Sequence, residues 1–313
     1  MTNSRKLAQT WPYPRRSHFV EQMKQTSEKW FVSNNCKLRS KYNYCLADWN
    51  DWPKNIILPE VTKYIEHIRE ERGAAGNGFA LHEYIHHGLS SQALLFNLIG
   101  PLITRNNLEP LQKTLDAQGL IWPALNAKAE LEYEDRKVFN EDSGQPTSID
   151  VVVGNPDNPG ALFIECKFTE NGFGGCSVFE NGDCDGRNPT SNLSMCYLHY
   201  IGRRYWELLQ KYGFLFGTLT TDSSCILINH YQFFREVLFA LEKGGTFILL
   251  SDDRSPTFSS GERGLMPFLL KFVPEQYKNR IGRVRIQDVV KAIEVPGKND
   301  DWIGVFREKY GIE

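Results

Sequence analysis

The stretch TSIDVVVGNPDNPGALFIECKFTE, residues 147–170, contains two apolar runs joined by the connection GNPDNPG. Asparagine, aspartate, proline and glycine favour turns, and short runs rich in valine, isoleucine and phenylalanine favour strands. The stretch therefore predicts two antiparallel strands joined by a short loop. Three charged residues interrupt the apolar runs, Asp150 in the first run and Glu165 and Lys167 in the second.

A pairing that is symmetric about the middle of the connection sets the register of the two predicted strands. Gly154 then faces Ala161, and Asp150 lies opposite Glu165, with Cβ atoms about 5 Å apart. Lys167 shares the face of Glu165, because strand side chains alternate with a period of two. The opposite face carries side chains apolar enough to form a core, which are Ile149, Val151, Val153, Ile164 and Cys166.

The three charged side chains suggest a metal-dependent reaction. Two facing carboxylates repel, which raises the pKa of one of them or destabilises the hairpin. A divalent cation reverses that effect, and Mg²⁺ prefers such oxygen ligands. The Lys167 ammonium can then orient or deprotonate an attacking water, or stabilise charge on pentacovalent phosphorus. The pattern is typical of metal-assisted phosphodiester hydrolysis.

The alternative interpretation is a surface hairpin with a Glu–Lys ion pair and an unrelated aspartate. An E-x-K triplet alone is common and carries little weight. The aspartate in matching register, the apolar opposite face and a helix-then-strands context favour the metal site over the surface pair.

The rest of the chain predicts a mixed fold. The pattern AELEYED, residues 129–135, alternates as a half-buried strand does. A long helix before three successive strands, followed by helix and strand, indicates an α+β fold or an α/β fold with a mixed sheet. Further helices are predicted over 17–31, 61–72, parts of 80–118 interrupted near Gly88 and Gly100, 198–213 and 231–245, and further strands over 225–230 and 246–253.

Asp150 followed by Glu165-Cys166-Lys167 resembles the D…E-x-K signature of the PD-(D/E)xK nuclease superfamily. Further stretches resemble a bacterial restriction-endonuclease-like group within it, over roughly the central half of the chain. These stretches are Ser90-Ser91-Gln92-Ala93, Phe96-Asn97, Gly100-Pro101-Leu102, Glu132-Tyr133, Ile164 to Glu170, and Tyr231-Gln232 with Arg235.

The resemblance implies an αβββαβ core with a mixed central sheet and an endonuclease that acts on DNA. It implies that Asp150 and Glu165 ligate Mg²⁺, for which Mn²⁺ can substitute, and that Lys167 assists the nucleophile. A further acid or glutamine from the first helix or strand is frequent in this superfamily, and Gln92, Glu132 and Glu130 are the candidates, with Glu132 preferred. Gln232 can approach from the later helix, and Glu170 is interpreted as a solvated or hairpin-end residue.

With this resemblance the chain divides into three segments. Residues 1–60 are a basic, aromatic-rich N-terminal extension, 61–255 a nuclease-like core, and 256–313 a C-terminal helical addition packed on that core. Residues 1–45 carry nine Lys or Arg and two acids. Interleaved aromatics, among them Trp11, Tyr13 and Tyr44, suit phosphate contact and base stacking. A solvated arm anchored by its aromatics is the slightly favoured alternative.

Composition limits the class of protein. The 313 residues are 41% hydrophobic and 24% charged, as in soluble globular domains. No apolar run approaches the roughly 18 residues that span a bilayer, and the polar start MTNSRKLAQTWPYPRR does not read as a secretory signal. Seven cysteines, an odd number, favour a reducing compartment, so we expect a cytoplasmic protein. A nuclease that cleaves both strands of DNA needs two active sites, which is compatible with a homodimer.

A competing motif is His82-Glu83-Tyr84-Ile85-His86. On a helix, histidines four residues apart share a face and can bind Zn²⁺, with the glutamate as general base of a peptidase. The early Gly88 and the lack of a third ligand disfavour this interpretation. A further alternative is a non-catalytic nucleic-acid-binding relative of the nuclease fold, which has no need of facing carboxylates.

A cysteine-rich segment follows the predicted active-site strand. Cys176, Cys184 and Cys196, with Cys166, are candidates for a structural metal, and some nucleases of the superfamily carry an iron–sulfur cluster. Their spacing matches no usual zinc or iron–sulfur pattern, and Cys166 should face the core. Free thiols are therefore the default interpretation.

Overall fold

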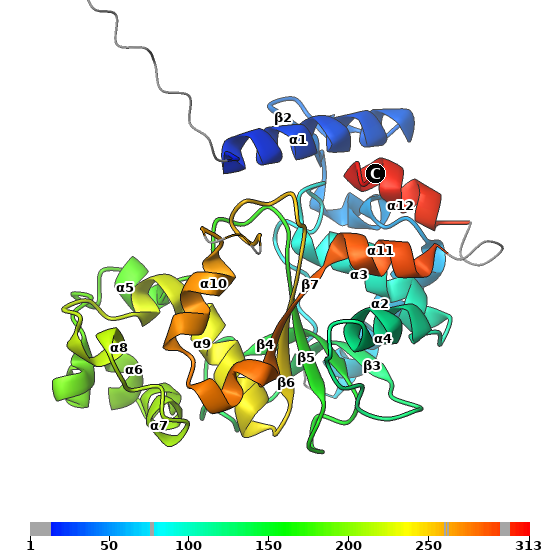
Figure 1. Cartoon of the computed structure of the whole chain (residues 1–313). Coiled ribbons are helices and arrows are strands. Elements are labelled where there is room, and N and C mark those ends of the chain that lie inside the picture. The colour runs from blue at the N-terminus through cyan, green and yellow to red at the C-terminus, as the bar shows by residue number, and fades with distance from the viewer. Residues whose placement is uncertain (1–13, 76–77, 260, 262, 295–300) are drawn as a thin grey trace, which may run out of the picture.

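A computed structural model describes residues 14–75, 78–259, 261, 263–294 and 301–313. At its centre lies a five-stranded sheet whose spatial order is also the chain order (Figure 1). Trp11 and Tyr13 of the N-terminal extension lie outside the described residues. The strands of the sheet are β3 (Ala129–Glu134), β4 (Ser148–Val153), β5 (Leu162–Lys167), β6 (Thr246–Ser251) and β7 (Ile281–Arg285).

The sheet is mixed, because β3, β4 and β5 are antiparallel neighbours whereas β5, β6 and β7 run parallel. The β4–β5 ladder pairs Val151 with Ile164 and Val153 with Leu162, which is the predicted register. The crossover from β5 to β6 contains α9 (Leu227–Glu242), as a parallel pair requires a long connection. With α3 (Ser91–Thr104) before β3, the predicted fold class is confirmed.

Helices cover both faces of the sheet (Figure 1). On one face, α3 forms a hydrophobic core with α2 (Pro59–Ala74), α4 (Glu109–Asp116) and α11 (Ile286–Ile293). On the other face, α9 forms a second core with α7 (Tyr205–Lys211) and α10 (Leu265–Leu269). The central strands are therefore covered on both sides, and every residue of β5 is buried.

Helix α3 is apolar around most of its circumference because it lies between the sheet and α2. The Ser90 hydroxyl caps it by accepting a hydrogen bond from the Ala93 N–H at 3.2 Å. Gly100 permits close approach to α2, since a Cβ there would lie 2.6 Å from Cγ1 of Val61. The helix thus continues through Gly100, where the sequence predicted an interruption.

The N-terminal part forms α1 (Arg16–Ser33), β1 (Leu38–Arg39) and β2 (Tyr42–Leu46), and α1 packs on β2 and on α12 (Ile303–Tyr310). Within the described residues, none of the helices combines the length and the apolar character that crossing a membrane requires. The remaining helices are α5 (Ser177–Glu180), α6 (Tyr197–Tyr200), α8 (Thr218–Thr221) and 3-10 turns at Trp49–Asn55, Pro189–Ser191, Leu193–Met195, Leu270–Phe272 and Glu275–Arg280.

Four further local predictions were wrong. Residues 225–230, predicted as a strand, lead into and begin α9, and residues 80–90, predicted as partly helical, contain turns. The segment 256–313, predicted as helical, also supplies β7 at the edge of the sheet. Ile149 lies in the core on the α9 face rather than with Val151, because the β3–β4 pair changes faces at Glu132.

Candidate active site

The candidate site lies where β4 separates from β5. The regular ladder between these strands ends at the pair Val151 and Ile164. One residue further, Oδ2 of Asp150 accepts a hydrogen bond from the Cys166 backbone N–H at 2.7 Å. The aspartate side chain thus takes the place of a backbone acceptor, which holds its carboxylate against β5.

Glu165 and Lys167 project from β5 on the face covered by α9. Both are buried, with exposed fractions of 3% and 6%. Lys167 Nζ donates to Glu165 Oε1 at 2.7 Å and to Gln232 Oε1 at 3.0 Å, while Gln232 Nε2 donates to Glu165 Oε1 at 2.7 Å. Gln232 of α9 therefore joins both charged groups. The second oxygen, Glu165 Oε2, is buried and has no hydrogen-bond partner within the described part of the chain.

Glu132 reaches the same cleft from β3 through an unusual backbone conformation. Its φ is +52°, in the left-handed region that non-glycine residues seldom adopt. Arg72 of α2 supports this bend by donating to the backbone oxygens of Leu131, at 2.8 Å, and of Glu132. The bend sends Leu131 and Tyr133, two residues apart, into opposite cores. It leaves the Glu132 side chain beside the separating strands.

Gln92 and Ser148 hold the Glu132 carboxylate. Gln92 Nε2 donates to Oε1 at 2.7 Å, and the Ser148 hydroxyl donates to Oε2 at 3.0 Å. Both Gln92 and Glu132 line the cleft that Asp150, Glu165 and Lys167 line. All five predicted site residues therefore lie around one cleft.

Two other acids named from the sequence have different surroundings. Glu130 is half-exposed, pairs with Arg72 at 2.5 Å and is not among the residues that line the cleft. Glu170 borders the cleft, but its Oε2 accepts the Phe168 N–H at 2.6 Å, as suits a residue at the end of a strand. Of Glu130 and Glu132, the structure thus brings only Glu132 to the site.

The carboxylates of the site disfavour one another's charge. Burial raises the pKa of Asp150 well above its usual value, and the charges of Glu165 and Glu132 add to this effect. Burial also raises the pKa of Glu132 to about 7. Although burial opposes it, the Glu165 carboxylate and other nearby acids raise the pKa of Lys167, so its ammonium keeps its proton.

An acid that sequence reasoning missed, Glu236, lies next to this group on α9. It is fully buried, and neither of its oxygens meets a partner at hydrogen-bonding geometry within the described residues. Burial and the Glu165 charge raise its pKa well above the usual value, which favours the neutral acid. No motif marks it in the sequence; its only signal is an acid directly before the apolar run VLFAL of a helix.

These donors fit a hard divalent cation. Asp150, Glu165 and Glu132 offer carboxylate oxygens, the ligands that Mg²⁺ prefers, and Glu165 Oε2 is a buried oxygen without a partner. Burial raises the pKa values of Asp150 and Glu132, and the nearby carboxylate charge adds to both shifts, which a cation would oppose. A buried unpaired oxygen costs stability in a closed protein, so its presence beside two further carboxylates supports a metal site.

The raised pKa of Glu132 predicts how metal-free stability changes with pH. Between about 4.5 and about 7 the folded protein keeps a proton on Glu132 that the unfolded chain has released, so the free energy of unfolding falls as pH rises. We expect denaturant unfolding with a chelator present to show lower stability at pH 8 than at pH 5. Glu132→Gln should reduce that difference, and Glu130→Gln should keep it. An unchanged slope in Glu132→Gln would contradict the assignment.

A large cleft of about 1500 Å³ opens above these residues. Its walls come from α1, from residues 78–92, from the loop after β3 and from the segment after β5. Besides Lys167, the lysines and arginines that line it are Arg16, Lys24, Arg136, Arg203 and Arg235.

The zinc-peptidase interpretation of residues 82–86 is wrong in its geometry, because the segment contains turns instead of the helix that the motif needs. His82 stacks near Tyr84 at the cleft, whereas His86 is buried and points elsewhere. The ligand atoms of His86, His87 and Cys45 lie within 4.8 Å of one another, and His82 does not belong to this group.

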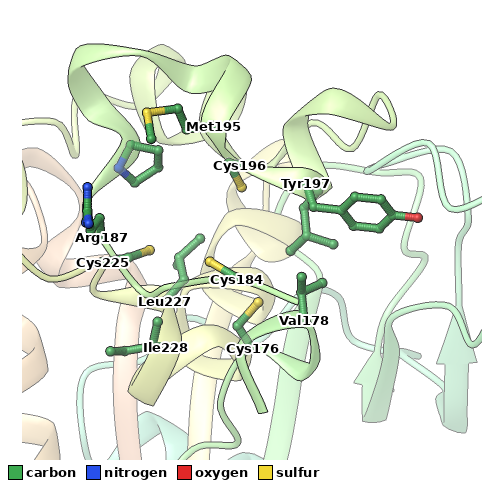
Figure 2. Close-up of a pocket in the computed structure, with 12 residues that line it drawn as sticks. Cys176, Val178, Cys184, Arg187, Met195, Cys196, Tyr197, Cys225, Leu227 and Ile228 are labelled. Carbon is green, nitrogen blue, oxygen red and sulfur yellow. The ribbon is translucent and has the colours of Figure 1, made fainter. Parts of the chain in front are cut away.

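The structure brings together three of the four predicted cysteines and replaces the fourth with another. Cys166 faces the core on the α3 side. Cys176, Cys184 and Cys196 line one small pocket, and the fourth cysteine of that pocket is Cys225 (Figure 2). The sequence did not connect Cys225 with the others, because nearly thirty residues separate it from Cys196.

Of the comparisons with known proteins, the one with protein families agrees with this architecture. No curated protein and no solved structure matches the chain. A family described as restriction endonuclease associating with ARP (REase-ARP) matches residues 23–311, nearly the whole sequence. The chain therefore belongs to this restriction-endonuclease-like family.

Proposed function

We propose that this protein is a Mg²⁺-dependent nuclease that hydrolyses phosphodiester bonds of DNA. The observation that carries the proposal is the convergence of Asp150, Glu165 and Lys167 at one cleft, with Glu165 Oε2 buried and unpaired. In this proposal Asp150 and Glu165 hold the ion, and Glu132 adds a further carboxylate. Family membership supports the nuclease class.

Each side chain has a defined part in the proposed reaction. Bound Mg²⁺ would act as a Lewis acid on a phosphate oxygen and lower the pKa of a bound water. Lys167 keeps its ammonium proton because acids surround it, so we assign it to orient the attacking water and to stabilise charge on phosphorus by donating hydrogen bonds from Nζ. Gln232 positions Lys167 and Glu165, and Gln92 positions Glu132.

DNA is the proposed substrate because of the charge and aromatic content around the cleft. Arg16 and Lys24 extend from α1, and Arg136 and Arg203 line the cleft near the β3 loop. Below this rim Glu132 and Glu165 are buried and Asp150 is half-buried. The groups that first meet a phosphate backbone therefore include several cations. Exposed tyrosines at the same cleft, Tyr84 and Tyr197, can stack on bases.

The experiment is a cleavage assay on plasmid and single-stranded DNA. We expect cleavage with Mg²⁺ or Mn²⁺ and none with a chelator, because the carboxylates alone cannot activate water for this reaction. Casein is the control substrate for peptidase activity and should stay intact with Zn²⁺. Tight DNA binding without cleavage under any divalent cation would contradict the proposal and favour a non-catalytic relative.

A further inference from the structure

Four cysteines from separate parts of the chain line one pocket beside the cleft (Figure 2). Cys176 directly precedes α5, Cys184 follows it, Cys196 directly precedes α6, and Cys225 lies two residues before α9. Cys176 and Cys225 are buried, the other two are half-buried, and all four are free thiols. Most of the pocket's exposed lining is apolar, so the four sulfurs are its most reactive groups.

Each of the four sulfur atoms faces at least one N–H group. The Gly186 N–H donates to Cys184 Sγ at 3.4 Å, and the Trp206 indole N–H donates to Cys196 Sγ at 3.3 Å. Backbone N–H groups of residues 178 and 179 face Cys176, and that of Leu227 faces Cys225. A neutral thiol is a weak acceptor, whereas a thiolate attracts such donors strongly. Four sulfurs that face N–H donors resemble metal-bound thiolates, in which hydrogen bonds to the sulfurs help to set the reduction potential of the metal centre.

Three of these donors share one local geometry. In Cys184, Cys176 and Cys225 a backbone N–H two residues later faces the sulfur. The chain therefore wraps around each of these sulfurs in a tight turn. All three of these cysteines line the pocket, Cys225 at the edge of the core on the α9 face, whereas Cys166 lies in the core on the α3 face and does not line it.

The segment that carries the cysteines has little core of its own. Its helices α5 and α6 are only four residues long, and Met195, Tyr197 and Tyr200 are exposed by 61%, 53% and 77%. A segment that buries so little apolar surface requires another source of stability, and bound metals supply it in small folds.

We propose that Cys176, Cys184, Cys196 and Cys225 bind a metal centre through their four thiolates, and that this centre is an iron–sulfur cluster. The separation of the sulfurs favours a cluster over one ion. Among the described residues, only Cys45, His86 and His87 form a group of three or more whose ligand atoms all lie within 4.8 Å of one another. Thiolates on a single zinc, at about 2.3 Å each, would lie roughly 4 Å apart, whereas each cysteine of a [4Fe–4S] cluster binds a different iron.

The centre would stabilise one wall of the cleft. Residues next to or between the cysteines, including Gly174, Ser177 and Tyr197, line the cleft directly. A metal centre behind them would hold this wall in place beside Lys167 and Gln232. No redox step is involved in this role, and it is independent of the carboxylates that are proposed to hold Mg²⁺.

The test is metal and sulfide analysis of the full chain purified without exposure to air. We expect about four irons and four acid-labile sulfides per chain, with the broad visible absorption of iron–thiolate bonds. Cys184→Ser and Cys225→Ser should lose most of this iron, while Cys36→Ser, a thiol far from the pocket, should keep it. Asp150→Asn should also keep it, which separates this result from any failure of the nuclease proposal.

The wild-type protein alone already decides the outcome if a cysteine variant does not fold. One zinc per chain without sulfide, lost in the pocket variants, would support the four-thiolate metal site and overturn the iron–sulfur assignment. Neither metal, together with reaction of all four pocket thiols with a thiol reagent in the folded wild type, would overturn the proposal as a whole.

Discussion

Asp150→Asn should abolish metal-dependent DNA cleavage, lowering the rate on the order of 10³-fold, because a ligand charge worth several kcal/mol at the transition state is removed. The amide can still accept the Cys166 N–H through its Oδ atom, so the separation of β4 from β5 should be kept. The measurement is the initial rate of plasmid cleavage at saturating Mg²⁺. A neutral side chain of the same shape thus isolates the effect of charge.

The same substitution should stabilise the metal-free protein. The pKa of Asp150 is raised well above its usual value by burial and by Glu165, which means that its charged form opposes folding above the ordinary pKa. We expect a higher melting temperature for Asp150→Asn at pH 8 with a chelator present, and a smaller gain at pH 5. Lost activity combined with gained stability is characteristic of a residue retained for function.

Asp157→Asn is the matched control for this prediction. Asp157 lies in the connection of the same hairpin, is exposed, and pairs with Lys243 at 2.9 Å. Its loss should leave cleavage unchanged. A cleaving Asp150→Asn protein, or equal stability effects at the two positions, would contradict the assigned role of Asp150.

The hairpin was predictable because its information is local. A short connection sets the register, a period of two sets the faces, and the two together place Val151 against Ile164 and Lys167 beside Glu165. The fold class also followed from the order of apolar patterns along the chain. These predictions needed no knowledge of residues distant in sequence.

The position of Glu132 was not predictable in the same way. Its φ of +52° changes the face of the strand, and nothing in the alternating pattern AELEYE marks such a bend. The support comes from Arg72, sixty residues earlier, which donates to the backbone there. Counting alternate residues along the strand therefore assigns the wrong face at Glu132, the residue whose side chain reaches the site.

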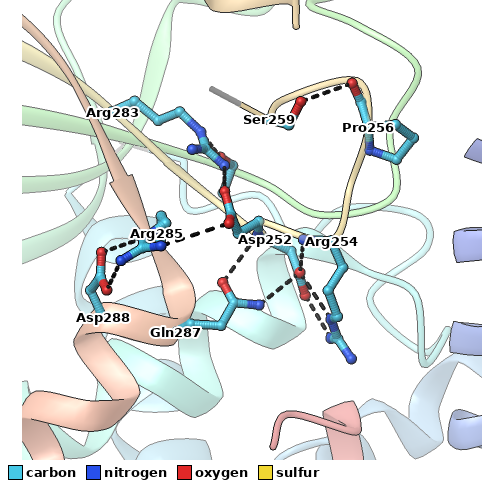
Figure 3. Close-up of polar contacts among 10 residues, drawn as sticks. Asp252, Arg254, Pro256, Ser259, Arg283, Arg285, Gln287 and Asp288 are labelled. Atoms are coloured by element: carbon cyan, nitrogen blue, oxygen red, sulfur yellow. Dashed lines mark hydrogen bonds and ion pairs between the residues drawn. The ribbon is translucent and has the colours of Figure 1, made fainter. Parts of the chain in front are cut away.

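The C-terminal segment could not be predicted for a similar reason. The fully buried Asp252, just after β6, accepts hydrogen bonds from Arg254 and from Gln287 of α11 (Figure 3). Arg254 also donates to the Tyr310 carbonyl at 2.8 Å. These contacts join positions up to 56 residues apart. They make the end of the chain part of the sheet's support, although its sequence pattern indicates only mixed helices.

Lys167→Met should give the second large effect, in which activity and stability fall together. Loss of the ammonium should lower cleavage by about 10²- to 10⁴-fold, the range for a group that assists proton transfer or charge stabilisation. Lys167 is also the only cation that pairs with Glu165 in the described residues. Its removal leaves a buried carboxylate with only Gln232, which costs about 3–5 kcal/mol when the acid stays charged.

A double-mutant cycle separates the two effects. Glu165→Gln added to Lys167→Met removes the unpaired charge, so denaturant unfolding should recover much of the lost stability while cleavage stays absent. Lys211→Met is the matched control, since Lys211 pairs with Glu242 at a half-exposed position away from the cleft. If the double variant were no more stable than Lys167→Met, the ion pair would not be what Lys167 contributes to folding. If Lys167→Met cleaved DNA at the wild-type rate, another group would act on the water.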